Sequence, residues 1–443
     1  MRSRIFIVYA FILIAARAAD LPAAHPPMGW NSWDAYGTTV TEAEAKANAD
    51  YMARHLKSHG WQYVIIDIQW SDPGAKAHGY RPNAELAMDS YGRLIPAENR
   101  FPSSVGGRGF KPLADYIHQL GLKFGIHIMR GIPRQAVKAN LSLLDTGVKA
   151  ADIADTHSVC PWNTDMYGVD TSRRGGQEYY DSILKLYAEW GVDFIKADDI
   201  ARPVYRGEIA ALQRAIRKTG RTIVLSLSPG PATIKDLSFL QENANMWRIS
   251  DDFWDDWQSL KQTFLLLSVW GGTGRPGAWP DADMLPLGRL GLRAERGEAR
   301  MTNFTRDEAR TVMSLWSISQ SPLIFGGDLP SLDEFTSSLL TNDEVLAVEQ
   351  SGSHGYPYWQ SGGRVAWVAE SDDRGTKYLG VFNTEDRAVE IRVDWGALNM
   401  PERCLLRDLW QRQDLGAISG GYTFPLAPHA SGLYRVSSAG SVR

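Results

Sequence analysis

The chain has 443 residues, and 44% of them are hydrophobic, so it can bury more core than one ordinary compact domain holds. Its formal net charge is −4 with both signs mixed along the chain, which argues against a nucleic-acid-binding protein and against an anionic-membrane partner. A large barrel of about 250–300 residues followed by a domain of about 100 residues fits this length.

The N-terminus has the pattern of a secretory signal peptide. Two arginines precede an apolar stretch from Ile5 to Ala15, and residues 16–18 read Ala-Arg-Ala, a small-residue cleavage pattern. The stretch is too short to serve as a stable membrane anchor. We therefore expect a signal peptide over residues 1–18, a secreted or periplasmic protein, and no membrane contact after cleavage.

Strand-like and helix-like segments then alternate along the chain. Helical patterns are expected over 112–121, 177–191, 208–220 and 41–60, the last with Thr41 as its cap and Gly60 as its stop. Apolar strands separated by amphipathic helices indicate a parallel sheet with a covered outer face, and eight such units favour a (β/α)8 TIM barrel over an open sheet. We assign the barrel to residues 24–338. The eight strand candidates cover residues 27–33, 63–70, 123–129, 193–199, 222–228, 246–252, 279–285 and 322–328.

The pattern changes after about Leu340. Short alternating runs such as VAWVAES (365–371) and AVEIRVDW (388–395) follow one another with turn signals between them and no helical pattern. These runs predict a C-terminal antiparallel β-sandwich, which we assign to residues 345–443. Cys160 and Cys404 fall in different predicted domains, so we expect two buried free thiols and no disulfide.

Charged residues stand at the C-terminal ends of several predicted strands, where barrel enzymes carry their chemistry. In DFIKADD (193–199), the two-residue period of a strand puts Lys196 and Asp198 on one face and Asp199 on the other. The same rule separates Asp251 from Asp252, and we expect Asp199 and Asp251 to be helix caps or loop hydrogen-bonders. Choosing the inward faces in this way gathers one set of side chains, Asp67, Lys196, Asp198, Arg248, Asp252 and Asp283, which His127 and either Ser226 or Ser228 are placed to join.

So many charged groups at one barrel mouth are costly to bury without a function. Two chemistries use such a site: a carboxylate pair that cleaves a glycosidic bond, and a metal centre. The chain has no HExxH motif, and Lys196 and Arg248 supply the positive charge that a metal would bring. We therefore expect an enzyme with neither a metal nor another cofactor. A metal-dependent hydrolase and a non-catalytic carbohydrate-binding protein remain the alternatives.

The glycosidase interpretation gives each residue a role. Asp198 is the ionised nucleophile, favoured in that form by the nearby Lys196, and Asp252 is the general acid. We expect Arg248 to contact the sugar or the nucleophile rather than to pair with Asp252. The other predicted sugar contacts are Trp33, Asp67, His127, Ser228 and Asp283.

Together these motifs resemble glycoside hydrolase family 27, the melibiase-type α-galactosidases. The segments MGWNSW, VIIDIQW, FIKADD, RISDDFWDDW and WPDADML are similar to five strand signatures of the family, and SLWSISQSPLIFGGDL is similar to its last helix and strand. The match spans about residues 26–330. It implies a barrel followed by a β-sandwich, a retaining mechanism, Asp198 as nucleophile, Asp252 as acid/base, and sugar contacts from Trp33, Asp67, Lys196, Arg248 and Asp283.

Several positions depart from the common pattern of that family. Asp67 is followed by Ile68 where many members have a second aspartate, and His127 stands where a tyrosine is common. The loop after the fifth strand reads SLSPGP (226–231) in place of Cys-Glu-Trp or its Ser/Ala variant, and Ile200 replaces a cysteine. We expect an exo-glycosidase that removes terminal α-galactose from an oligosaccharide or polysaccharide. β-L-Arabinopyranosidase, α-N-acetylgalactosaminidase and isomaltose-releasing dextranase activities remain open.

Overall fold

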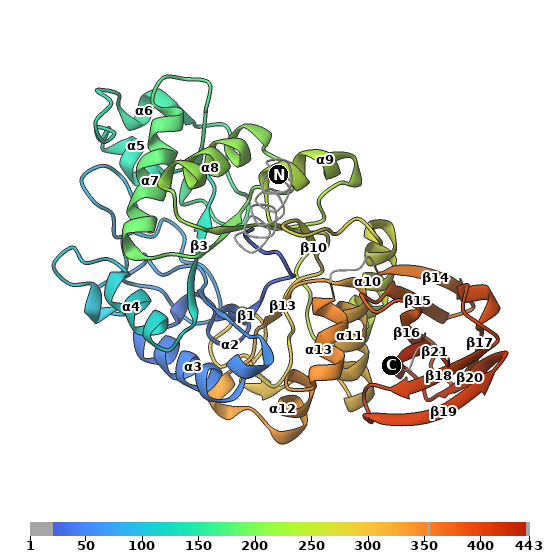
Figure 1. The fold of residues 1–443 in the computed structure, drawn as a ribbon. Coiled ribbons are helices and arrows are strands. Elements are labelled where there is room, and N and C mark those ends of the chain that lie inside the picture. Colours follow the sequence, from blue (N-terminus) through green and yellow to red (C-terminus); the bar gives the residue numbers. More distant parts are fainter. Residues whose placement is uncertain (1–20, 352–354, 440–443) are drawn as a thin grey trace, which may run out of the picture.

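The computed structural model describes residues 21–351 and 355–439 (Figure 1), so the predicted signal peptide lies outside the described residues. An eight-stranded parallel sheet forms the first domain, in the order β10-β9-β8-β7-β3-β2-β1-β13. Leu285 closes the sheet into a barrel, because it pairs with Phe325 and its main-chain nitrogen donates to the Ile324 oxygen at 2.7 Å. The predicted barrel is confirmed. Its strands are β1 (Met28–Asn31), β2 (Tyr63–Ile66), β3 (Lys123–Met129), β7 (Phe194–Asp198), β8 (Val224–Leu227), β9 (Met246–Arg248), β10 (Trp279–Asp281) and β13 (Leu323–Phe325).

Helices follow the strands and cover the outer face of the sheet (Figure 1). The predicted helix 41–60 is α3 (Glu42–His55), which Thr41 caps in a reciprocal capping box with Glu44, followed by a short 3-10 turn that ends at the left-handed Gly60. The other long helices are α4 (Lys111–Gln119), α7 (Gly176–Trp190), α8 (Arg206–Thr219), α9 (Leu237–Asn243), α10 (Trp257–Trp270), α11 (Arg306–Ser319), α12 (Glu334–Leu340) and α13 (Asp343–Gln350).

One long connection carries structure of its own. Between β3 and α7 the chain makes an excursion, residues 130–175, that contains a three-stranded sheet in the order β4-β6-β5. Because the excursion leaves the C-terminal end of β3, it lies at the end of the barrel where the strands finish. Its elements are β4 (Ile132–Pro133), α5 (Arg134–Lys138), α6 (Ala150–Ile153), β5 (Ala154–Asp155) and β6 (Met166–Val169).

The C-terminal domain is antiparallel, as predicted. A six-stranded sheet in the order β14-β15-β16-β21-β18-β19 packs with a two-stranded sheet of β17 and β20 around its own apolar cluster. The strands of the larger sheet are β14 (Tyr356–Ser361), β15 (Arg364–Glu370), β16 (Thr376–Asn383), β21 (Ser431–Ser438), β18 (Arg403–Asp408) and β19 (Gln413–Ser419); the smaller sheet holds β17 (Val389–Asp394) and β20 (Gly421–Leu426).

The two domains share a core at α11. The buried positions of this helix run almost without a break from Glu308 to Ile318, so it is covered on both sides. On the sandwich side, the Trp410 indole donates to the Ser314 hydroxyl at 2.9 Å, and His429 stacks on Trp257 with ring centres 3.7 Å apart. Cys160 and Cys404 are both buried and unpaired. Among the described residues, no helix combines the length and apolar character that a bilayer-spanning segment needs.

Candidate active site

A pocket of about 320 Å³, which we call the catalytic pocket, opens where the barrel strands end. Seven of the nine predicted site residues line it, while His127 and Asp283 lie behind its wall, 1% and 2% exposed. The structure therefore brings the predicted residues together, but it makes these two supports for other side chains. The full lining is Trp33, Asp67, Ile68, Tyr80, Trp162, Lys196, Asp198, Arg202, Ser228, Pro229, Arg248, Asp251, Asp252, Met284, Glu295 and Arg296.

Asp198 is the last residue of β7, and its carboxylate is held on both oxygens. The Ser228 hydroxyl donates to Oδ1 at 2.8 Å, the main-chain nitrogen of Asp199 donates to the same atom at 2.9 Å, and His127 Nε2 lies 3.2 Å from Oδ2. Burial alone would raise the pKa of Asp198, but His127 and the Lys196 charge outweigh it and hold the pKa below its usual range. The side chain is 14% exposed, so it is an ionised carboxylate that a ligand can reach.

Lys196 makes its direct contact with Asp67 and acts on Asp198 through its charge, as expected. Its ammonium donates to Asp67 at 2.8 Å, and the Asn31 amide donates to the same oxygen at 2.7 Å. Burial would raise the pKa of Asp67, yet the Lys196 and His127 charges lower it. Lys196 therefore acts on Asp198 through its charge and fixes Asp67 directly. Asp67 Oδ1 accepts from the Ile68 main-chain nitrogen at 2.8 Å, so the pair offers a sugar hydroxyl the second lone pair of that oxygen and the remaining ammonium protons.

The prediction that Arg248 avoids Asp252 is wrong. Arg248 lies 3.4 Å from Asp252 and 2.8 Å from Asp283, on opposite arms of one guanidinium. Burial raises the pKa of Asp283 to about 7 in spite of Arg248, because Asp252 and Asp281 add negative charge nearby. Asp283 also accepts from the Phe253 main-chain nitrogen at 2.8 Å, which ties it to the loop that carries Asp252. Arg248 and Asp283 thus position Asp252, whose side chain is 43% exposed at the pocket mouth.

Asp199 and Asp251, the two aspartates expected to point away from the site, behave differently. Asp199 has a left-handed backbone (φ 55°), which turns its side chain away from the pocket to pair with the buried Arg130 at 2.7 Å. This agrees with a structural role. Asp251 was also expected to point away, but it lines the catalytic pocket and pairs with Arg202 at 2.8 Å. The reason is that β9 ends at Arg248, so strand alternation no longer applies three residues later.

Three aromatic side chains contribute to the wall, and sequence reasoning found only one of them. Tyr80 comes from the long loop after β2 and stacks on Trp33, with ring centres 5.8 Å apart and an angle of 26°. Burial, then the charges of Asp198 and Asp67, raise the pKa of Tyr80 well above its usual value, so its hydroxyl stays a neutral donor. Trp162, in the β3–α7 excursion, is 37% exposed at the rim. Aromatic faces of this kind pack against the apolar face of a sugar ring.

An additional acid that the sequence reasoning missed lies near these groups. Asp34 follows Trp33 in the NSWD segment, is 1% exposed, and packs its carboxylate against Gly326, where an added Cβ would come within 1.8 Å of Oδ2. Burial, followed by the charge of Asp283, raises the pKa of Asp34 well above its usual value. It therefore adds a neutral acid, not a further negative charge, beneath the site.

Nothing in this arrangement resembles a metal centre. The described residues contain no group of three His, Cys, Asp or Glu side chains placed to hold an ion. The carboxylates in the catalytic pocket are instead interleaved with Lys196 and Arg248, which compensate their charge. The fold and the site together define a barrel glycoside hydrolase: a reachable, ionised aspartate and a second aspartate line one pocket at the C-terminal ends of the strands.

Comparison with known proteins identifies the glycoside hydrolase family to which the chain belongs. Residues 165–351 match the family model described as alpha galactosidase A, and residues 361–436 match the alpha galactosidase C-terminal beta sandwich domain. The crystal structure of a GH27 β-L-arabinopyranosidase from Geobacillus stearothermophilus is 52% identical, covers 95% of this chain and 98% of its own, and superposes with a TM-score of 0.93. The chain belongs to glycoside hydrolase family 27.

More distant relatives are named for other activities. Alpha-galactosidase 2 of Arabidopsis thaliana is 28% identical over 94% of this chain and 90% of its own length. Alpha-N-acetylgalactosaminidase of Gallus gallus is 28% identical over 74% of this chain and 71% of its own. The family is therefore settled, and it includes enzymes for more than one terminal sugar.

Proposed function

We propose that this enzyme removes terminal β-L-arabinopyranosyl residues from glycans with retention of anomeric configuration. The observation that carries the proposal is the Asp198 carboxylate, held ionised by His127, Ser228 and the Lys196 charge, in the same pocket as Asp252. A nucleophile that is ionised and partly exposed is what a double-displacement glycosidase needs.

The first step forms a covalent intermediate. Asp252 gives its proton to the glycosidic oxygen, the bond from that oxygen to the anomeric carbon breaks, and an Asp198 oxygen bonds to the anomeric carbon. Oδ1 already accepts two hydrogen bonds, at 2.8 and 2.9 Å, whereas Oδ2 has one contact at 3.2 Å. We therefore assign the attack to Oδ2, which keeps the more available lone pairs.

The second step releases the sugar. Asp252, now a carboxylate, takes a proton from water as the water oxygen bonds to the anomeric carbon and the Asp198–sugar bond breaks. The 43% exposure of Asp252 suits this exchange of leaving group for water. Arg248 lies 3.4 Å from Asp252 and holds that side chain at the pocket mouth in this step.

Ile68 and the 52% identical neighbour support the choice of sugar. β-L-Arabinopyranose has the ring configuration of α-D-galactopyranose but carries hydrogen in place of the hydroxymethyl group. Ile68 lines the catalytic pocket directly after Asp67, where many family members have a second aspartate. An isoleucine offers bulk and no hydrogen bond, so it favours the sugar that lacks the extra hydroxyl. The neighbour is a β-L-arabinopyranosidase, and a variant of it was solved in complex with arabinose.

Terminal α-galactoside cleavage is the second candidate. It is supported by the curated relatives named as α-galactosidases, at 26–28% identity. The two sugars have the same ring and the same hydroxyl configuration, and they differ only in the hydroxymethyl group outside the ring. One pocket can therefore turn over both at different rates.

A panel of p-nitrophenyl glycosides tests the proposal: β-L-arabinopyranoside, α-galactoside, α-N-acetylgalactosaminide and α-glucoside. We expect kcat/KM for the arabinopyranoside to exceed that for the galactoside by about tenfold or more, the range that one group in a pocket provides. Ile68→Asn should narrow this ratio, and the matched Ile68→Leu should keep it. A preference for the galactoside would replace the first candidate with the second. NMR of the first product shows the anomer and would reject retention if the configuration were inverted.

We also propose that the enzyme is exported to the periplasm or the exterior. The two arginines, the apolar stretch and the Ala-Arg-Ala sequence near the N-terminus support this. N-terminal sequencing of the mature protein, expected to begin after Ala18, tests the proposal.

A further inference from the structure

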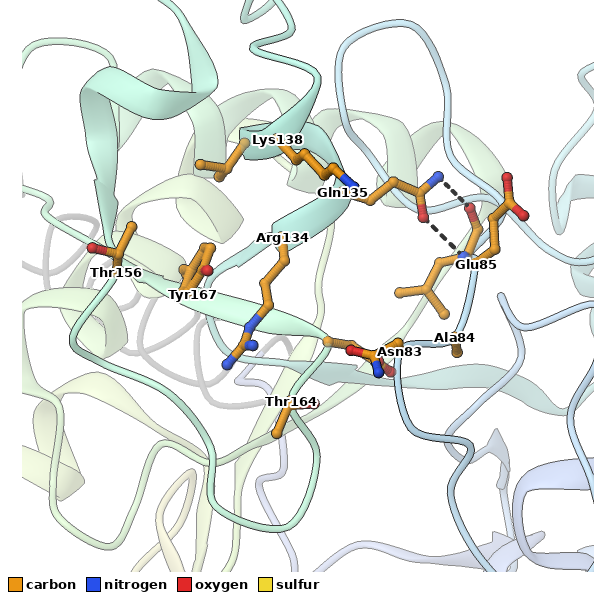
Figure 2. A pocket seen from close by; sticks show the side chains of 12 residues that line it. Asn83, Ala84, Glu85, Arg134, Gln135, Lys138, Thr156, Thr164 and Tyr167 are labelled. Atoms are coloured by element: carbon orange, nitrogen blue, oxygen red, sulfur yellow. Dashed lines mark hydrogen bonds between the residues drawn. The ribbon is translucent and has the colours of Figure 1, made fainter.

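A second pocket of about 560 Å³, shown in Figure 2, is lined by residues distinct from those of the catalytic pocket, and we call it the distal pocket. One wall is α5, another is the loop of residues 83–86, and the floor comes from residues 164–167 of the β3–α7 excursion. The two pockets are joined through this excursion. Gln69, two residues after Asp67, donates to Asp165 in the floor of the distal pocket, and Trp162 lines the catalytic pocket.

The walls of the distal pocket are fixed by main-chain contacts. The Gln135 amide bonds to the Leu86 main chain in both directions, at 3.0 and 3.2 Å, and these are the dashed lines in Figure 2. The main-chain nitrogen of Arg134 donates to the main-chain oxygen of Asp165 at 2.9 Å. The guanidinium of Arg134 lies over the Tyr167 ring, 4.6 Å from its centre. A pocket braced in this way is preformed, which lowers the entropy cost of binding.

The polar side chains that face the distal pocket are largely uncommitted. Among the described residues, Arg134 forms no ion pair, and its one side-chain hydrogen bond is from Nε to the Met166 oxygen at 3.5 Å. Lys138, Thr156 and Thr164 are exposed lining residues whose side chains have no protein hydrogen-bond partner in the same part of the chain. In Figure 2, Arg134 crosses the middle of the pocket with Thr156 and Tyr167 on one side and Asn83 on the other. These groups are available to a ligand.

The charges of the lining indicate what kind of ligand fits. Two cations, Arg134 and Lys138, face the same space as two acids, Glu85 and Asp165, so the lining carries no net charge. A phosphate or a uronate would meet acids as well as cations there, and an apolar ligand would leave the polar groups unpaired. A neutral, hydroxyl-rich ligand uses both kinds of group, because each hydroxyl both donates and accepts.

We propose that the distal pocket binds the neutral sugar chain that carries the terminal residue, while that residue occupies the catalytic pocket. Trp162 and Asp165 are three residues apart, so at most about 10 Å of extended chain, roughly two sugar rings, separates the pockets along this loop. Trp162 at the rim provides an aromatic surface between them. The inference rests on the proposed function, because it takes the substrate to be a glycan larger than one sugar.

The experiment compares a large and a small substrate of the same terminal sugar. Kinetics are measured on an arabinogalactan with terminal β-L-arabinopyranosyl groups and on p-nitrophenyl β-L-arabinopyranoside, for the wild type, Arg134→Ala and Lys138→Ala. Arg134→Ala should raise KM for the arabinogalactan by about tenfold, the effect of one or two lost hydrogen bonds, with kcat unchanged. KM for the aryl glycoside should stay within about twofold of the wild type. Lys138 is exposed, so its variant provides a second test that folds.

Arg275→Ala is the matched control. Arg275 lines a pocket at the opposite end of the barrel and, like Arg134, donates one weak hydrogen bond to a main-chain oxygen, that of Gln241 at 3.3 Å. It should change neither KM. If Arg134→Ala and Lys138→Ala leave the ratio of the two KM values at the wild-type level, the distal pocket is not a subsite. Absence of turnover of the aryl glycoside by the wild type would instead overturn the proposed sugar specificity.

A binding measurement tests the inference even if the wild type does not hydrolyse the aryl arabinopyranoside. Affinity electrophoresis of the inactive Asp198→Asn variant, through gels containing arabinogalactan or galactomannan, should show retardation by at least one polysaccharide. Adding Arg134→Ala to the inactive variant should reduce that retardation, and adding Arg275→Ala should not. Equal retardation with and without Arg134, or none by either polysaccharide, would overturn the inference.

Discussion

We expect His127 to set the acid side of the pH profile through one contact. Its Nε2 lies 3.2 Å from Asp198 Oδ2, it is 1% exposed, and it is a leading contributor to the lowered pKa of Asp198. His127→Phe removes the contact while keeping a ring of similar size in the same space. Burial then acts on Asp198 with less compensation, so the pKa of Asp198 should rise.

The size of the shift follows from the contact that is lost. A hydrogen bond to a charged group contributes about 1.5–3 kcal/mol, and one pKa unit corresponds to about 1.4 kcal/mol, so the pKa should rise by about 1–2 units. Because kcat/KM reports ionisation in the free enzyme, its acidic limb should move up by the same amount. The assay is the pH dependence of kcat/KM on the aryl glycoside that the wild type hydrolyses best.

The lowered pKa of Asp198 also makes the stability of the fold depend on pH. A carboxyl whose pKa is lowered in the folded state adds stability above its ordinary pKa of about 4 and loses it as the pH falls through the folded value. His127→Phe should therefore cost most stability above about pH 4 and little at lower pH. His118→Phe is the control, because His118 pairs with Asp193 at 2.7 Å at the other end of β7. An acidic limb that stays in place in His127→Phe, or that moves equally in His118→Phe, would refute the reasoning.

Three further predictions concern the same pocket. Asp198→Asn should lower kcat by about four orders of magnitude or more. Asp199→Ala should retain turnover but lose about 3 kcal/mol of unfolding free energy in urea, because it leaves Arg130 with one buried partner fewer. Equal loss of turnover in both folded variants would show that the separation of the two aspartates into a catalytic and a structural one is wrong. Tyr80→Leu should reduce kcat/KM by about tenfold, because it removes both the stack on Trp33 and the neutral hydroxyl. Tyr80→Phe should reduce kcat/KM by less. If both variants had the same kcat/KM, the whole effect would belong to the hydroxyl. A chelator such as EDTA should leave the rate unchanged, since Lys196 and the guanidinium beside Asp252 supply the positive charge; loss of activity that added metal restores would favour the metal-dependent alternative.

The parts of the site that the sequence predicted are those governed by regular strands. β7 runs through Lys196 and Asp198, so the two-residue period correctly placed these two side chains on one face. Asp199 lies beyond the strand and turns away because of its left-handed backbone, which alternation does not describe. The barrel itself followed from eight repeated strand and helix patterns, which local residue preferences encode. Both inferences needed only neighbours along the chain.

The parts that failed depend on contacts between distant segments or on chain beyond a strand end. β9 and β10 end at Arg248 and Asp281, so loops set the positions of Asp251, which was expected outside the pocket, and of Asp283, whose left-handed backbone (φ 90°) no strand rule describes. Tyr80 reaches the pocket from a loop with no periodic pattern, and its stack on Trp33 is a long-range contact. His127 was correctly placed near the mouth, but only the packed structure shows that it supports Asp198 from behind.

The position of α11 has a consequence for how the protein loses its structure. The helix is packed by the barrel on one side and by the sandwich on the other, and one apolar cluster runs from Trp316 in this helix to Trp367 and Leu433 in the sandwich. Removing the C-terminal domain would uncover a helix that the barrel needs, together with the ring of Trp257. We therefore expect the two domains to unfold cooperatively, although the sequence shows a clear boundary between them. Heat or denaturant should unfold both domains in one transition. The catalytic pocket should then be lost when the C-terminal domain unfolds, although that domain contributes no residue to the pocket.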